Sequence, residues 1–171
     1  MGMEFSGLSV ALATPFNAHG DVDLKAFRRL VQHVAAGGAD TLVVLGTTGE
    51  ASTLEDEERD TLISACLQEA HGKKVVVGTG HNATRQAAVW TKRAQALGAH
   101  GALVVTPYYN KPTLAGLVAH YSAVADAAPG LPLILYNVPG RTGLNVTPAA
   151  LAKLWANSQV VAVKESSGSL P

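Results

Sequence analysis

The chain has 171 residues, and its 13 lysines and arginines balance 13 aspartates and glutamates, so the formal net charge is zero. That balance argues against nucleic acid or an anionic membrane as the main partner. With 47% hydrophobic and 15% charged residues, the composition is that of a packed globular protein and excludes a disordered one. The single cysteine, Cys66, precludes an internal disulfide. We expect a soluble, cytoplasmic protein without a leader or membrane span.

Short apolar runs, rich in valine and leucine, recur along the chain at similar intervals. These runs are Leu8–Ala13, Thr41–Leu45, Lys74–Val77, Ala102–Val105, Leu133–Tyr136 and Val160–Val163. They do not alternate with polar residues, a pattern typical of strands that are buried on both faces of a parallel sheet.

Helical spacing of apolar residues fills the intervals between these strands. The five predicted helices begin near Leu24, after a capping box of Thr53 and Asp56, at Thr84, before Leu117, and at Thr147 with Pro148. Alternation of strands and helices predicts one α/β domain, residues 1–171, with a βα-repeat fold. An open doubly wound sheet and a (β/α)8 barrel both fit this alternation.

Polar segments follow four of the strands directly, and they favour the barrel. The segments are Gly46–Glu50, Thr106–Asn110, Asn137–Thr142 and Lys164–Glu165. A barrel brings all its strand ends to one axis, whereas an open sheet binds its ligand at one switch point. We therefore expect a shared site at the C-terminal strand ends.

Lys164 ends an apolar strand, which suggests a nucleophilic amine. Burial of an amine disfavours its ammonium form and frees the electron pair that attacks a carbonyl. A lysine that leaves the sheet to reach solvent is the alternative. Tyr136 ends the preceding predicted strand, where it could transfer a proton as Schiff-base chemistry requires, or serve as a core tyrosine.

Two further segments offer groups that bind carboxylates. The loop from Gly46 to Glu50 supplies amides and the hydroxyls of Thr47 and Thr48, although a lone glycine turn has the same composition. Arg141 follows Pro139 and Gly140, and its guanidinium could hold a second carboxylate in a two-point fork or remain a surface cation.

Dinucleotide binding is the competing interpretation. Gly78–Ala83 satisfies a G-x-G-x-x-A pattern between a strand and a helix. Yet the acidic residue expected about 20 positions later is missing, because Thr84–Ala125 contains no aspartate or glutamate. The histidines show no metal-binding spacing, so we predict no metal site and expect surface or capping positions for His19, His33, His71, His81, His100 and His120. Cys66 is expected in the core.

Taken together, the motifs resemble the dihydrodipicolinate synthase family of pyruvate-dependent class I aldolases. Its motifs are matched in order by Gly46–Glu50, Tyr108–Pro112, Tyr136–Thr142 and Val163–Gly168. The resemblance implies a (β/α)8 barrel that condenses pyruvate with L-aspartate 4-semialdehyde in lysine and diaminopimelate biosynthesis. It also implies a homotetramer, arranged as a dimer of dimers, with no cofactor beyond a covalent Schiff base.

The same resemblance implies a role for each matching residue. Lys164 is similar to the Schiff-base nucleophile, and Tyr136, Thr47 and Tyr109 to a proton relay in which Tyr109 comes from the neighbouring subunit. Gly46 and Thr48 resemble the ligands of the pyruvate carboxylate, and Arg141 the ligand of the semialdehyde carboxylate.

Lysine regulates many family members at the dimer interface, where Tyr108 and Asn82 match the site. Gln86 stands where an acid commonly binds the lysine amine, and Asp56 and Arg59 replace histidines, so we predict weak feedback inhibition.

Family members are longer than this sequence, which corresponds to about the first six βα units. The last two units and a C-terminal helical domain have no counterpart in residues 1–171. A non-catalytic partial barrel, or another pyruvate-dependent aldolase or lyase of the superfamily, is therefore the alternative function.

Overall fold

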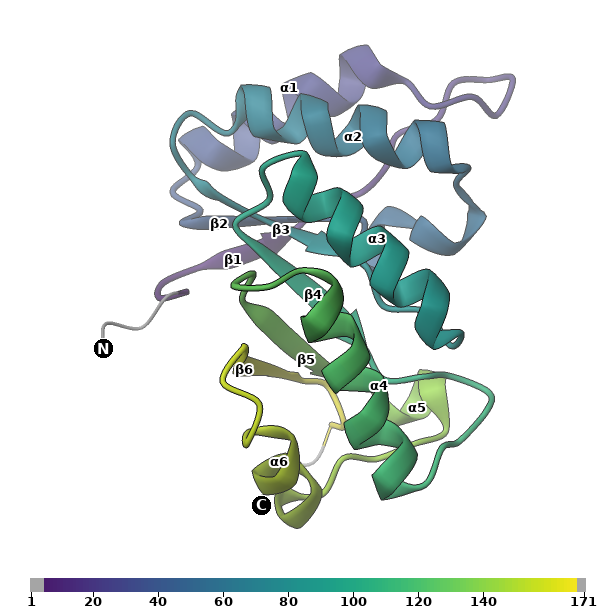
Figure 1. Ribbon diagram of the computed structural model, residues 1–171. Coiled ribbons are helices and arrows are strands. Elements are labelled where there is room, and N and C mark those ends of the chain that lie inside the picture. Colours follow the sequence, from purple (N-terminus) through teal and green to yellow (C-terminus); the bar gives the residue numbers. More distant parts are fainter. Residues whose placement is uncertain (1–4, 169–171) are drawn as a thin grey trace. The chain divides into compact units, whose positions relative to one another are not determined.

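The computed structural model describes residues 5–168 (Figure 1). Residues 1–4, which belong to the segment where we expected no leader, and residues 169–171 lie outside the described residues. The strands are β1 (Ser9–Ala11), β2 (Thr41–Val44), β3 (Lys74–Gly78), β4 (Gly101–Val105), β5 (Leu133–Asn137) and β6 (Val160–Glu165). The helices are α1 (Leu24–Ala36), α2 (Asp56–Glu69), α3 (Thr84–Ala96), α4 (Leu114–Ala127), α5 (Pro139–Thr142) and α6 (Pro148–Leu154), with 3-10 turns η1 (Thr47–Gly49) and η2 (Ala51–Thr53). The predicted βα alternation is confirmed.

The chain divides into two compact units. The first contains the chain up to Gly78 together with Ala96–His100, and the second contains Thr79–Gln95 and the chain from Gly101 onward. Within the described residues, no helix is long and apolar enough to cross a membrane.

In the first unit, β2 lies between β1 and β3, and all three strands are parallel. Phe27 and Val31 of α1, together with Leu62 and Cys66 of α2, are fully buried in its core. Burial raises the pKa of the Cys66 thiol to about 12, so this cysteine stays protonated in the core as expected.

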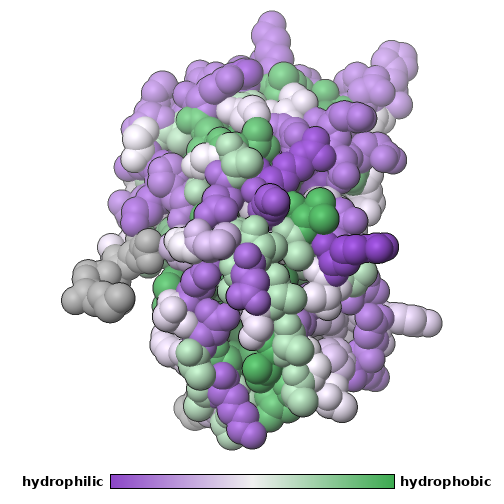
Figure 2. All heavy atoms as spheres, viewed as in Figure 1, coloured by the Kyte–Doolittle hydropathy of each residue, from purple (hydrophilic) through white to green (hydrophobic). Residues whose placement is uncertain are grey.

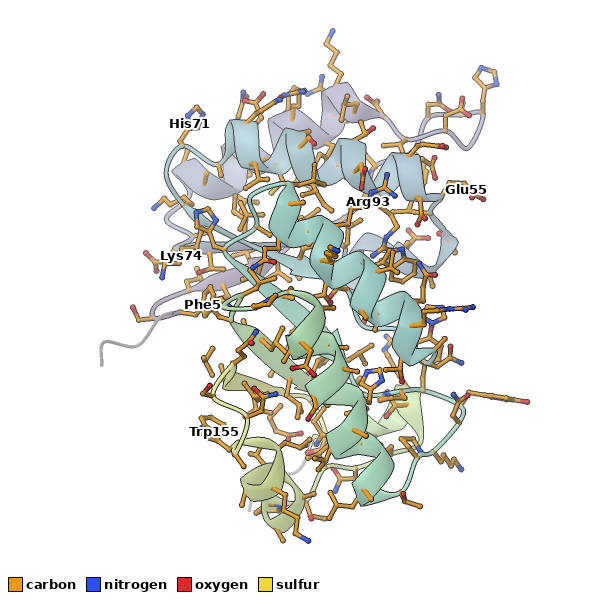
Figure 3. The ribbon with its side chains drawn as sticks, viewed as in Figure 1. Phe5, Glu55, His71, Lys74, Arg93 and Trp155 are labelled. Atoms are coloured by element: carbon orange, nitrogen blue, oxygen red, sulfur yellow. The ribbon has the colours of Figure 1, made fainter. Side chains whose placement is uncertain are left out.

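Helices α1 and α2 are also joined on their solvent side. The Arg28 guanidinium lies 2.6 Å from a Glu69 carboxylate oxygen, and the Gln32 amide donates to the other oxygen at 2.6 Å. These hydrogen bonds, that from Gln32 first, lower the pKa of Glu69. The surface over the two helices is mostly hydrophilic in Figure 2. At the start of β3, the Lys74 ammonium lies 5.0 Å from the centre of the Phe5 ring (Figure 3).

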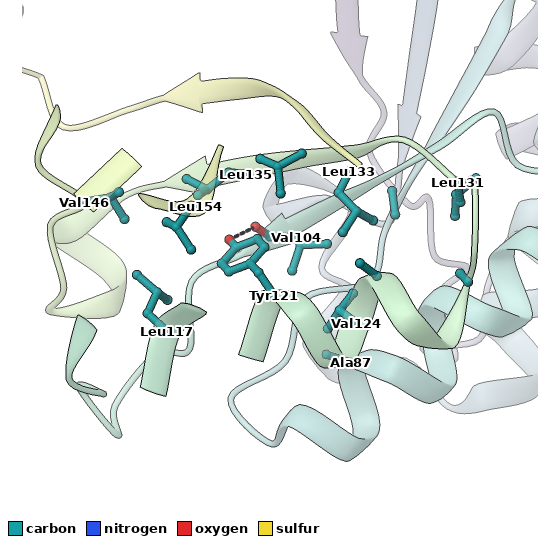
Figure 4. Close-up of a cluster of buried hydrophobic side chains, with 14 residues drawn as sticks. Ala87, Val104, Leu117, Tyr121, Val124, Leu131, Leu133, Leu135, Val146 and Leu154 are labelled. Atoms are coloured by element: carbon teal, nitrogen blue, oxygen red, sulfur yellow. Dashed lines mark hydrogen bonds between the residues drawn. The ribbon is translucent and has the colours of Figure 1, made fainter. Parts of the chain in front are cut away.

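In the second unit, β5 lies between β4 and β6, again with all strands parallel. Its core packs α4 against β4 and β5 around Tyr121, whose hydroxyl donates to the Val104 carbonyl at 2.7 Å (Figure 4). Burial raises the pKa of this phenol far above its ordinary value. The hydrogen bond lets the aromatic ring fill the core without leaving a buried hydroxyl unsatisfied.

The pairing of β5 with β6 contains a one-residue irregularity. Leu133 pairs with Val160, but the next residue, Ile134, pairs with Ala162, so Val161 has no register partner. From there the register is regular to the end, and it places Lys164 opposite Tyr136. A β-bulge of this kind changes which side chains of the bulged strand face the partner strand.

Two local predictions are wrong. His120 is not a surface or capping residue: it is only 3% exposed, and its Nδ1 lies 2.9 Å from the Thr84 hydroxyl. The capping box of α2 is not Thr53 with Asp56 but Glu55 with Glu58, two residues later in the chain, where the Glu58 carboxylate accepts the Glu55 amide at 2.9 Å. By contrast, Thr147 caps α6 as predicted, since its side chain accepts the Ala150 amide.

Candidate functional site

Lys164 and Tyr136 form a close pair at the ends of β6 and β5. They are register partners, and the Lys164 ammonium lies 4.4 Å from the centre of the Tyr136 ring. Tyr136 is 7% exposed and Lys164 is half-buried. A cation within about 6 Å of an aromatic face is attracted by its quadrupole, so the ring holds the amine at this strand end. The arrangement places an amine and a phenol side by side in the second unit.

Arg141 projects from α5, immediately after β5. Pro139 begins this helix, Gly143 ends it with a φ of 72°, and the Thr142 hydroxyl donates to the Leu144 carbonyl at 3.0 Å. These features fix the turn, because proline presets a helical φ and glycine accepts the left-handed conformation without steric cost. Arg141 is exposed; its backbone amide donates to the Val138 carbonyl at 2.9 Å, but its guanidinium has no hydrogen-bond or ion-pair partner among residues 5–168. Its guanidinium is therefore available to an anionic ligand.

The loop after β2 belongs to the first unit. Leu45 has a φ of 58° and Glu50 a φ of 52°, so the chain bends sharply on either side of η1. The Thr14 hydroxyl donates to the Gly49 carbonyl at 2.7 Å and anchors the turn. Non-glycine residues at positive φ cost on the order of 1 kcal/mol, and such strain is found mainly at functional sites.

This bend leaves the two threonines of η1 on the surface of the first unit. Thr47 and Thr48 are exposed, whereas Gly46 is buried. Their hydroxyls can donate to a carboxylate.

Tyr109 lies in the loop after β4 with a φ of 70°, and its amide donates to the Thr142 carbonyl at 3.3 Å. Its side chain is 88% exposed and makes no ring contact or hydrogen bond with the other described residues. The structure thus places Tyr136 and Lys164 together but does not bring Tyr109 to them within one chain.

Asn82 and Tyr108, predicted as a regulatory site, lie on neighbouring loops of the second unit. Asn110 donates to the Asn82 carbonyl at 3.0 Å, and the His81 ring meets the Tyr108 ring edge-on at 5.8 Å. Gln86 is in the first turn of α3 and is partly exposed.

Arg59, which stands in place of a histidine of this regulatory site, is 3% exposed. Its guanidinium donates to the Ala51 and Gly78 carbonyls at 2.8 and 2.9 Å. Those contacts hold it inside the first unit.

The glycines of the dinucleotide-like motif have a packing explanation. A side chain at Gly78 would collide with the Leu45 carbonyl, and one at Gly80 would collide with the Val105 backbone. Only glycine permits these approaches. No group of three or more possible metal ligands occurs among residues 5–168.

Asn137 and Glu165 lie in polar segments that the sequence placed at the strand ends, but neither was assigned a role of its own, although each directly follows a predicted site residue. Asn137 is buried, and its side-chain amide donates to both carboxylate oxygens of Glu165, at 3.1 and 2.9 Å. A polar residue at the buried end of an apolar strand was the available signal.

Comparison with known proteins places the chain among relatives of one kind. A model of the dihydrodipicolinate synthetase family matches residues 4–171. The 4-hydroxy-tetrahydrodipicolinate synthase of Geotalea daltonii is 53% identical over 167 residues, which are 97% of this chain and 57% of that relative. The chain thus spans little more than half the length of such relatives.

Solved structures give the same result. Dihydrodipicolinate synthase from Cyanidioschyzon merolae with lysine bound has a TM-score of 0.93 at 43% identity, covering 96% of this chain and 57% of that one. The enzyme from Acinetobacter baumannii complexed with pyruvate has a TM-score of 0.91 at 45% identity, covering 95% and 56%. The fold is accordingly that of the first six βα units of a (β/α)8 barrel, and the doubly wound alternative is set aside. The chain belongs to the dihydrodipicolinate synthetase family.

Proposed function

We propose that the full-length gene product is a lyase that condenses pyruvate with L-aspartate 4-semialdehyde, through a Schiff base on Lys164. The observation that carries the proposal is the Lys164–Tyr136 pair, with its 4.4 Å separation of amine and ring centre at two adjacent strand ends. Family membership and relatives named 4-hydroxy-tetrahydrodipicolinate synthase support it. Pyruvate also occurs in the Acinetobacter baumannii relative.

The chemistry follows from an amine beside a phenol. The Lys164 amine attacks the ketone carbon of pyruvate, and loss of water leaves an imine. The protonated imine withdraws electrons from the adjacent methyl group, which loses a proton to give an enamine. That carbon then attacks the aldehyde carbon of the second substrate. We assign the proton transfers that these steps require to Tyr136.

Thr47 and Tyr109 complete the proposed relay with Tyr136. We assign Tyr109 to the site of a neighbouring subunit, because its side chain is 88% exposed and makes no ring contact or hydrogen bond with the described residues of its own chain. This assignment calls for a homo-oligomer, and we propose a dimer of dimers. Each subunit then lends a tyrosine to its partner.

Two groups of residues are proposed to bind the two carboxylates. Gly46 and Thr48 offer an amide and a hydroxyl to pyruvate from the bent loop after β2. Arg141 offers its free guanidinium to the semialdehyde from the fixed turn α5. The combination of Tyr109 and Arg141 favours an amino-acid aldehyde over the sugar aldehydes used by other lyases of the superfamily.

The remaining expectations belong to the same proposal. Residues 1–171 form the N-terminal part of one barrel domain, since relatives are longer than this chain. The reaction needs no cofactor besides the covalent imine, and neither nucleic acid nor membrane takes part. The protein works in the cytoplasm, and lysine binding at Tyr108, Asn82 and Gln86 is weak.

Turnover measurements test the proposal. The full-length gene product is incubated with pyruvate and L-aspartate 4-semialdehyde, and the condensation product is followed by mass spectrometry. Omitting either substrate should abolish the product, and a sugar aldehyde should not replace the semialdehyde. Turnover with the sugar aldehyde alone would assign the protein to another lyase, and no turnover with either acceptor would favour a non-catalytic role.

A further inference from the structure

Asn137 and Glu165 directly follow Tyr136 and Lys164, and they too are register partners. The Asn137 side-chain nitrogen lies 3.1 Å from Glu165 Oε1 and 2.9 Å from Oε2. Successive side chains of a strand point to opposite faces, so this bridge lies behind the face that carries the amine and the phenol. It joins β5 and β6 at their last register pair, just before each strand ends.

Each member of the bridge is also tied to the loop that follows a strand. The Asn137 amide nitrogen donates to Asn145 Oδ1 at 2.9 Å, and its oxygen accepts the Val146 amide at 3.0 Å. Glu165 Oε1 accepts the Ser167 amide at 2.7 Å. Asn137, at 1% exposure, therefore uses both amide hydrogens and its oxygen in hydrogen bonds.

Charge strengthens the bridge. The Asn137 amide, and after it Ser167, lower the pKa of the Glu165 carboxyl, which keeps the acceptor ionised. Hydrogen bonds to an ionised acceptor are roughly twice as strong as neutral ones.

The register that the bridge holds is not the one a regular ladder would adopt. Without the bulge at Val161, Val163 would stand opposite Tyr136, and Lys164 would point to the other face of the sheet. The residues between Val160 and Val163 are all small and apolar, so their side chains discriminate weakly between the two registers. Something beyond these side chains must pin the strand end.

We propose that the Asn137–Glu165 bridge is a positioning device that locks β6 in the bulged register and so holds the Lys164 amine against Tyr136. The inference deepens the proposed function and rests on it. Asn137 and Glu165 act through Lys164 and touch no substrate. Supporting groups of this kind alter rates strongly, because a misplacement of about 1 Å can cost roughly a hundredfold in rate.

The test compares three variants of the full-length gene product. Glu165→Ala removes the acceptor at an exposed position, where folding should survive. Glu165→Gln keeps one acceptor oxygen. Asn145→Ala is the matched control, because it removes another hydrogen bond of Asn137 and leaves the bridge intact. For each, the rate at which pyruvate forms a borohydride-trappable imine is measured beside the melting temperature and the exchange rate of the Ser166 amide, which donates to the Asn137 carbonyl at 2.9 Å.

We expect Glu165→Ala to trap pyruvate roughly 10- to 100-fold more slowly, with faster Ser166 exchange. Glu165→Gln should recover most of the trapping rate. Asn145→Ala should retain that rate even if its melting temperature falls as far as that of Glu165→Ala. Equal trapping by Glu165→Ala and the unaltered protein would overturn the inference alone, and so would rates that merely follow melting temperature in all three variants. If the unaltered protein forms no trappable imine, the proposed function fails and the positioning role fails with it.

Discussion

Acidification should weaken the second unit, because His120 has to stay uncharged in the folded protein. The residue is 3% exposed, and its Nε2 is a buried atom without a hydrogen-bond partner among the described residues. Burial lowers the pKa of His120 from 6.5 to about 4. The pKa of this base is lower in the folded state than in the unfolded state. Its contribution to stability is therefore fully present at pH values above the pKa of the unfolded state. That contribution is lost as the pH falls from about 6.5 toward about 4, since the unfolded chain binds the proton first.

The expected loss follows from the interval between the two pKa values. Each pKa unit corresponds to 1.36 kcal/mol, so the loss reaches about 3 kcal/mol below pH 4 and about 2 kcal/mol at pH 5. The assay is urea unfolding of the full-length gene product and of His120→Asn, at about pH 7.5 and about pH 5. His120→Asn cannot titrate, so the free-energy difference between the two proteins should shift by about 2 kcal/mol in favour of the variant at the lower pH.

His19→Asn is the matched control, because His19 is exposed in the first unit. It should follow the unaltered protein at both pH values. The reasoning would be refuted if His120→Asn lost as much stability on acidification as the unaltered protein.

Three other outcomes are expected. Arg141→Ala should weaken use of the semialdehyde by about 2 kcal/mol in kcat/KM while pyruvate trapping continues, and a collapse of pyruvate binding would contradict the assigned role. Lysine should inhibit turnover weakly, since Gln86 offers a neutral amide where a carboxylate would bind the lysine amine, and Gln86→Glu should tighten inhibition; half-inhibition of the unaltered enzyme below millimolar lysine would contradict this. Residues 1–171 expressed alone should aggregate or turn over negligibly, because β1 and β6 each have a strand partner on one side only among the described residues, and a sharp melt with near-normal turnover would disprove it.

The sequence was informative wherever a pattern repeats over a whole element. All six strands begin and end within two residues of their predicted bounds, because each is an apolar run that stops at polar residues. The same rule correctly predicted that Lys164 and Tyr136 lie at the ends of adjacent strands. Local packing and cross-strand register were harder to read. Nothing in the run from Val160 to Val163 marks the bulge, since its residues are alike in size and polarity.

The sequence also contained signals for two features that we did not predict. His120 lies between Leu117, Tyr121 and Val124 at helical spacing, which places it on the buried face of α4. Pro139 and Gly143 occupy the first helical and the capping positions of α5, a recognised signature of a short helix. By contrast, the Asn137–Glu165 bridge depends on the register set by the bulge, so the sequence alone could not reveal it.

Peptide mapping after borohydride reduction tests the Schiff-base proposal most directly. The full-length gene product is mixed with pyruvate, reduced, digested and analysed by mass spectrometry, with Lys111→Ala and Lys164→Ala treated in parallel. We predict one pyruvate-derived adduct, on the peptide that carries Lys164, which persists in Lys111→Ala and disappears in Lys164→Ala. Equal labelling of Lys164→Ala, or an adduct confined to another lysine, would contradict the account.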